Sequence, residues 1–285
     1  MKRVDIVYRC VEDASEARER PHNANEARQR LNQGSLTFAS LFETGAERDI
    51  RHEIHVDPRD FGLLEDADHL LRQAPFAAVL GCSDARVPVE LIFNEGPNDL
   101  FVVRVAGNTL GDDVLGSLKF AVERLRASLK LIVVLGHSGC GAVTAAVDVF
   151  LDPAGYLALT SRHSVRMLVD RLQVVVHAAA LRIDHEYGAA VRRHPRYREV
   201  LVETSIVTNA ALAAHTLQQA INLTDGADVR ASYGVYILSD RSVWAPRIGS
   251  DEVIGLAAPP EDPQGFIEFG KAVLRSKRMT DLLAV

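Results

Sequence analysis

The sequence predicts an α/β protein built on a mainly parallel β-sheet of four to five strands, flanked by helices and preceded by an N-terminal helical arm. Short apolar runs rich in Val, Ile, Leu or Phe recur along the chain. They are continuously hydrophobic rather than alternating, which is typical of parallel strands covered on both faces. A segment with helical spacing connects two of these runs, as a parallel pair requires. The 285 residues are 47% hydrophobic and 25% charged, which is an ordinary globular composition.

Residues 1–24 are predicted to be a flexible or arm segment. From Glu12 onward this part of the chain is nearly all charged, Ala or Asn, and it includes Pro21. A helix is expected from about Asn25, with its apolar side chains facing the core or a second subunit. These side chains are Leu31, Phe38, Leu41 and Phe42.

Four apolar runs predict the strands of the sheet, and they are Phe76 to Leu80, Leu100 to Val105, Leu129 to Leu135 and Ala231 to Leu238. A crossover helix is expected between the second and third runs, because apolar residues there are spaced by threes and fours. These residues are Val114, Leu115, Leu118, Ala121, Val122 and Leu125. Before the fourth run, helical periodicity extends roughly from Ser164 to Ile221, with a break predicted at Pro195.

Polar side chains follow three of the predicted strands. The runs end in Gly81-Cys82-Ser83-Asp84-Ala85-Arg86, in Ala106-Gly107-Asn108 and in Gly136-His137-Ser138-Gly139-Cys140-Gly141. The carboxyl edge of an open parallel sheet is where ligands bind, so two Cys, one His, one Asp and one Arg are expected to converge there. Gly107 and Asn108 are expected to form a tight turn that brings backbone close to this site.

The residue types at this edge predict a zinc site. Thiolate and imidazole are ligands that zinc prefers, and the three ligands Cys82, His137 and Cys140 leave a fourth position open, as in catalytic sites. Asp84 either fills that position or accepts a hydrogen bond beside it, and Arg86 can pair with its carboxylate. With water as fourth ligand, zinc would supply hydroxide at neutral pH. The alternative is a closed structural site, with Asp84 or Cys10 as permanent fourth ligand.

The three motifs resemble those of the β-class carbonic anhydrases, with the second motif read as Arg104-Val105-Ala106-Gly107-Asn108. The resemblance implies reversible hydration of carbon dioxide to bicarbonate and a proton by zinc-bound hydroxide. It implies that Cys82, His137 and Cys140 are the zinc ligands, and that Asp84 and Arg86 form the catalytic dyad. It also implies a homodimer or higher homo-oligomer.

The resemblance places a catalytic domain at residues 25–245, with an insertion around residues 152–198 and a C-terminal extension over residues 246–285. Two other functions stay open. A related zinc hydrolase acting on carbon disulfide or carbonyl sulfide could use a similar site, with discrimination in the tunnel that leads to the metal. A non-enzymatic, zinc-stabilised assembly module would instead use the arm and the extension to bind partners.

The net charge and the cysteine content indicate which classes of partner and which cellular compartment to expect. The formal charge of −6 gives no general reason to expect nucleic acid or an anionic membrane as a partner. Three cysteines are too few for a disulfide framework and favour a reducing compartment, so a cytoplasmic protein is expected. No unbroken apolar run approaches the roughly 20 residues of a membrane span, and no membrane is expected as a partner.

Overall fold

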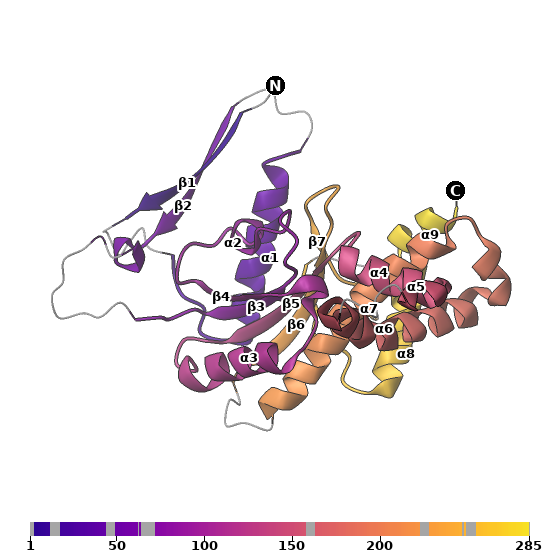
Figure 1. Cartoon of the computed structure of the whole chain (residues 1–285). Coiled ribbons are helices and arrows are strands. Elements are labelled where there is room, and N and C mark those ends of the chain that lie inside the picture. The colour runs from indigo at the N-terminus through magenta and orange to yellow at the C-terminus, as the bar shows by residue number, and fades with distance from the viewer. Residues whose placement is uncertain are drawn as a thin grey trace.

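The computed structural model of the chain describes residues 3–11, 18–43, 49–61, 63, 72–157, 163–222, 228–246, 248 and 255–284. A five-stranded sheet lies at its centre in the order β4-β3-β5-β6-β7 (Figure 1). Its strands are β3 (Ala77–Gly81), β4 (Leu100–Arg104), β5 (Leu131–His137), β6 (Arg230–Tyr236) and β7 (Val243–Trp244). The first four pair in parallel, and β7 pairs antiparallel with β6. The predicted α/β class with a mainly parallel sheet is confirmed.

Both faces of the central strands are buried, which explains why these strands are continuously apolar in sequence. Alternate residues of β3 belong to different hydrophobic cores: Ala78 and Leu80 to the first, Ala77 and Val79 to the second. The first core includes residues of α3 (Asp112–Arg124), α4 (Gly141–Leu151), α6 (His163–Tyr187) and α7 (Tyr197–Asn222). The second includes residues of α1 (Ala24–Ser40) and α2 (Val89–Ile92).

The predicted helices are confirmed, with shifted boundaries. The crossover helix α3 lies between β4 and β5. The long helical stretch is divided into α6 and α7 by the short 3-10 helix η3 (Ala189–Arg193), which ends just before Pro195. Within the predicted insertion, α5 (Ala154–Leu157) precedes α6. By length and composition α7 could span a membrane, but 72% of its apolar window is buried inside the fold, as in a core helix.

The N-terminal region contains two strands that the sequence pattern does not predict. Strands β1 (Val4–Cys10) and β2 (Ile50–Val56) form a separate parallel sheet, with Val4 opposite Ile50. This sheet extends away from the central sheet at the upper left of Figure 1. The expectation of a flexible or arm segment over residues 1–24 stays a prediction, although β1 within it is ordered by pairing with a distant segment. Residues 12–17 of that segment lie outside the described residues.

The predicted arm helix is confirmed as α1. Its first turn is capped by Asn23, whose side chain accepts a hydrogen bond from the Glu26 N–H at 3.0 Å. Leu31 and Phe38 of this helix pack in the second core, against the sheet. The 3-10 helix η1 (Pro58–Phe61) follows β2.

The C-terminal extension packs against the first core. It contains α8 (Pro263–Arg275) and α9 (Lys277–Leu283). Phe269 on α8 and Met279 on α9 are each 1% exposed and belong to the same core as α7. The proposed domain boundary at residue 245 stays a prediction, although the extension shares its hydrophobic core with the preceding domain.

Candidate metal centre

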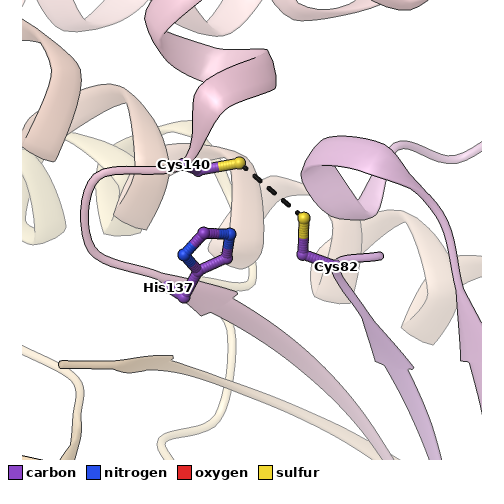
Figure 2. Close-up of side chains that lie close together, drawn as sticks. All are labelled: Cys82, His137 and Cys140. Carbon is purple, nitrogen blue, oxygen red and sulfur yellow. Dashed lines mark hydrogen bonds between the residues drawn. The ribbon is translucent and has the colours of Figure 1, made fainter. Parts of the chain in front are cut away.

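Three predicted ligands meet at the carboxyl edge of the sheet. Cys82 directly follows β3, His137 ends the neighbouring strand β5, and Cys140 is the N-cap of α4. Their ligand atoms all lie within 4.8 Å of one another, with the two sulfur atoms 3.9 Å apart (Figure 2). All three side chains are buried. Among the described residues, this is the group of His, Cys, Asp or Glu that is placed to hold a metal ion.

The orientation of His137 fits a metal ligand. Its Nδ1–H donates a hydrogen bond to the Ser138 carbonyl oxygen at 3.1 Å, which leaves Nε2 with a free lone pair. This Nε2 is buried and has no hydrogen-bond partner within the described part of the chain. Zinc–ligand bonds of 2.0–2.3 Å in a tetrahedron separate the ligand atoms by about 3.5 Å. The buried, unsatisfied nitrogen and the ligand spacing therefore both fit zinc.

The two neighbouring thiols can both ionise only if a cation lies between them. Contact with the Cys140 thiol lowers the pKa of Cys82 to about 4, with help from His137 and from the backbone N–H groups of Asp84 and Gly107, and against the effect of burial. The same contact, together with burial, raises the pKa of Cys140. Two thiolates this close repel each other, so the ionisation of both requires a positive charge between them.

Asp84 lies beside this cluster and is paired with Arg86. Its Oδ1 accepts hydrogen bonds from the Arg86 backbone N–H at 2.9 Å and from Nε at 3.0 Å, and its Oδ2 accepts from Nη2 at 2.7 Å. These bonds hold the pKa of Asp84 well below its usual range. Oδ2 is 3.8 Å from His137 Nε2. The predicted pair is thus present, and it holds Asp84 as a neighbour of the ligands.

Arg104 has a role that sequence reasoning did not assign. Its Nε donates to the Cys82 carbonyl oxygen at 2.9 Å, and its Nη2 donates to the Asp84 carbonyl oxygen at 2.5 Å. Arg104 ends β4, so it ties the loop after β3 to the adjacent strand. Its place in a recognised motif was the signal that could have found it.

The predicted turn at Gly107 is confirmed and supports Cys82. Gly107 has φ +66°, and its N–H donates to the Cys82 sulfur at 3.3 Å. Its carbonyl oxygen accepts a hydrogen bond from Asn209 Nδ2 on α7 at 2.8 Å. Asn209 was not predicted, because a single Asn in an apolar helix gives no local signal.

Known proteins similar to this chain belong to one family. A family model described as "Carbonic anhydrase" matches residues 77–225, just over half of the chain. "Carbonic anhydrase 2" of Mycobacterium tuberculosis is 49% identical over 88 residues, covering 30% of this chain and 42% of that protein. The carbonic anhydrase of Pseudomonas aeruginosa is 37% identical over 123 residues, covering 37% of this chain and 55% of that protein.

The chain thus spans about half the length of these two relatives. It also resembles a solved structure described as Coccomyxa beta-carbonic anhydrase in complex with acetazolamide. The TM-score is 0.48 at 22% identity, over 72% of this chain and 82% of that chain. The family match runs from β3 through α7 and contains all five predicted site residues, and the chain belongs to the β-class carbonic anhydrase family.

Proposed function

We propose that this chain is a zinc-dependent carbonic anhydrase, which hydrates carbon dioxide reversibly to bicarbonate and a proton. One observation carries the proposal: Cys82, His137 and Cys140 converge on one buried point, and the Asp84–Arg86 pair lies beside it. Three protein ligands leave a fourth position of a zinc ion open, which is the arrangement of catalytic zinc.

The residues of the chain supply orientation and charge. When bound, zinc acts as a Lewis acid that lowers the pKa of water and so provides a nucleophile at neutral pH. Asp84 would accept a hydrogen bond at Oδ2 from the attacking water and so orient its oxygen toward the carbon of carbon dioxide. Arg86 holds the Asp84 carboxylate through both of its oxygens and keeps it ionised.

The pairing with Arg86 favours an open site over a closed structural one. A carboxylate whose two oxygens already accept hydrogen bonds is held away from the metal position. Two thiolates and a neutral imidazole would balance the charge of a zinc dication. Adding the Asp84 carboxylate would give the whole site a net negative charge, which disfavours the ionisation of a bound water.

The experiment that tests this function is stopped-flow hydration of carbon dioxide by protein of measured zinc content, from neutral to mildly alkaline pH. Turnover that rises in proportion to zinc is expected. Protein with one zinc per chain and no turnover would contradict the proposal. The same preparation, tested with carbonyl sulfide and carbon disulfide, would then decide between a sulfur-substrate hydrolase and a non-enzymatic module.

We also propose a homodimer or larger homo-oligomer, working in a reducing compartment such as the cytoplasm. Tyr8 of β1 and Phe61 of η1, which follows β2, form an exposed aromatic pair whose ring centroids are 6.1 Å apart. A separate two-stranded sheet is only marginally stable, so a second copy covering it would stabilise it. The free thiols of Cys10, Cys82 and Cys140 support the compartment. Light scattering after gel filtration is expected to give at least twice the chain mass, and a monomer at micromolar concentration would contradict the assembly.

A further inference from the structure

The turn between the ligands His137 and Cys140 is held at two places. Its first half is joined to the end of β6: the Ser138 N–H donates to the Tyr236 carbonyl oxygen at 3.0 Å, and Ser138 Oγ accepts from the Leu238 N–H at 3.0 Å. Its second half is joined to α7, because the Gly139 N–H donates to Glu203 Oε1 at 2.9 Å. The position of this half of the turn therefore depends on the charged side chain of Glu203.

The backbone at Gly139 is shaped for this link. Its φ of +63° lies in the left-handed region, and a Cβ at this position would have no atom within 4 Å. Conformation, and not lack of space, therefore favours glycine here. In this conformation the N–H of Gly139 faces the carboxylate of Glu203.

Glu203 is in turn held by the C-terminal extension. Its Oε2 accepts hydrogen bonds from Arg278 on α9, at 3.2 Å from Nε and 2.5 Å from Nη2. The Glu203 side chain is 12% exposed, and the Arg278 side chain is 28% exposed. The neighbouring residue Met279 fixes α9 in the core, with its sulfur 3.9 Å from Thr204 Oγ1 on α7. Both carboxylate oxygens of Glu203 are thus used, one by the turn and one by α9.

We propose that Glu203 and Arg278 are positioning residues for the metal ligands. Arg278 fixes the Glu203 carboxylate, and Glu203 fixes the turn that carries His137 and Cys140. The C-terminal helix α9 thereby helps the site to retain zinc. This inference rests on the proposed function in one respect, namely that the cluster is a zinc site.

Loss of Arg278 would free Glu203. A cavity of about 720 Å³ borders Gly139, Glu203 and Arg278, so a released carboxylate has room to turn toward solvent. The Gly139 N–H would then lose its acceptor, and the turn would be held only by its bonds to β6. Residues that support metal ligands from outside typically change metal affinity by about 10- to 100-fold when they are replaced.

The test compares Arg278→Met with Lys277→Met in the full-length, zinc-loaded protein. Lys277 is on the same helix, borders the same cavity and pairs with Asp281 at 2.6 Å. Lys277→Met removes one positive charge, as Arg278→Met does, but it leaves the contact with Glu203 in place. Two readouts are used: the rate of zinc release to a chromogenic chelator, and hydrogen exchange at the Gly139 amide. We expect Arg278→Met to release zinc about 10-fold faster and to lose protection at Gly139, while Lys277→Met matches the wild type. Equal values for the two variants in both readouts would overturn the proposal.

A second variant tests the order of the contacts and covers the case in which Arg278→Met folds poorly. Glu203→Gln retains an oxygen acceptor for Gly139 but loses the ionic bond to Arg278. We expect faster zinc release from Glu203→Gln, and no further acceleration when Arg278→Met is added, because both changes break one chain of contacts. Wild-type zinc release from Glu203→Gln alone, or additive effects of the two substitutions, would overturn it.

Neither readout requires carbon dioxide. If the zinc-loaded protein has no hydration activity, the proposed function fails while the positioning role is still decided by zinc release. If the wild type binds no zinc, the cluster is not a zinc site and the positioning proposal fails, even where the Gly139 amide is protected.

Discussion

Glu203 and Asn209, both on α7, hold two turns at the proposed metal site: the turn between His137 and Cys140, and the turn at Gly107 that supports Cys82. Glu203 accepts from the Gly139 N–H between His137 and Cys140, and Asn209 donates to the Gly107 carbonyl oxygen. The N–H of Gly107 in turn bonds the sulfur of Cys82. One buried helix therefore sets the position of ligands that come from two different strands.

Asp84→Asn should keep zinc and lose turnover. An amide retains the shape of the side chain but accepts hydrogen bonds less strongly and does not pair ionically with Arg86. General acid–base and orienting groups typically contribute about 10²- to 10⁴-fold, so the hydration rate per zinc should fall within that range. Stopped-flow rates and zinc content are measured on the same sample.

The matched control is Asp148→Asn, which removes an Asp–Arg pair outside the site. Asp148 binds Arg198 at 2.7 and 2.9 Å, and both side chains are 49% exposed. The hydration rate of Asp148→Asn should equal that of the wild type. Wild-type turnover in Asp84→Asn would remove Asp84 from the mechanism, whereas loss of zinc in that variant would make Asp84 a ligand.

Cys140→Ser should abolish stoichiometric zinc binding, because a buried hydroxyl replaces a thiolate ligand. Cys10→Ser is the control, since Cys10 is exposed on β1 and does not belong to the cluster. Zinc per chain is measured by atomic absorption after gel filtration. Ligands that bind the native state raise its stability, so a chelator should lower the melting temperature of the wild type and of Cys10→Ser but not that of Cys140→Ser. One tightly held zinc in Cys140→Ser would disprove the ligand assignment.

Glu95 should make stability fall as the pH rises toward neutrality. Its buried carboxylate contacts Arg18 at 2.9 Å and Arg30 at 2.5 Å, yet burial outweighs these arginines and raises its pKa to about 7. The folded state therefore binds this proton more tightly than the unfolded chain does. The resulting stabilisation is complete below about pH 4.3 and is lost as the pH rises through about 7.

The pH effect is measured against Glu95→Gln, which stays neutral. Relative to this variant, the free energy of unfolding of the wild type should fall by about 3 kcal/mol between pH 4 and pH 8, at about 1.4 kcal/mol per unit of pKa shift. Urea unfolding across this range gives the values. The exposed Glu268, paired with Lys271, supplies the control Glu268→Gln, which should show no such trend. A wild-type advantage that grows with pH would contradict the assignment.

Gly34→Ala should destabilise the fold through a clash between α1 and the backbone of Phe93, the C-cap of α2. A Cβ on Gly34 would lie 1.8 Å from the Phe93 carbonyl oxygen, so the helices would have to separate. Overpacking of this kind typically costs about 1–3 kcal/mol. Gly116→Ala in α3 is the control, because a Cβ there meets nothing within 4 Å. It should stabilise the protein by about 0.5–1 kcal/mol through helix propensity. Denaturant unfolding measures both, and equal effects would refute the clash.

The central sheet and the ligand cluster could be predicted because their signals are local. The strands β3 and β5 are apolar on both faces, so they stand out in any short window of sequence. Cys82 and the His137–Cys140 turn directly follow these strands, and the topology rule for parallel sheets then brings them together.

The other elements could not be predicted because distant segments order them. β1 mixes apolar residues with Asp5 and Arg9 and is partly exposed, and it is a strand because Val4–Cys10 pair with Ile50–Val56. Glu203 and Asn209 are ordinary polar residues on an apolar helix, and their roles appear only once α7 lies beneath the loops they hold. Arg278 is still further from the site in sequence, at the end of the C-terminal extension.

The proposed metal ligands lie at or just after the ends of β3 and β5, and the chain between these neighbouring strands includes the whole of β4 and α3. Parallel strands pair only after such a crossover has closed, and long-range pairing is the slow part of folding. The cluster therefore forms when the sheet is already assembled, and a metal ion has no complete site to bind before that point. The proposed zinc ion would then act only on the folded state: it would slow unfolding and leave the refolding rate of the chain unchanged.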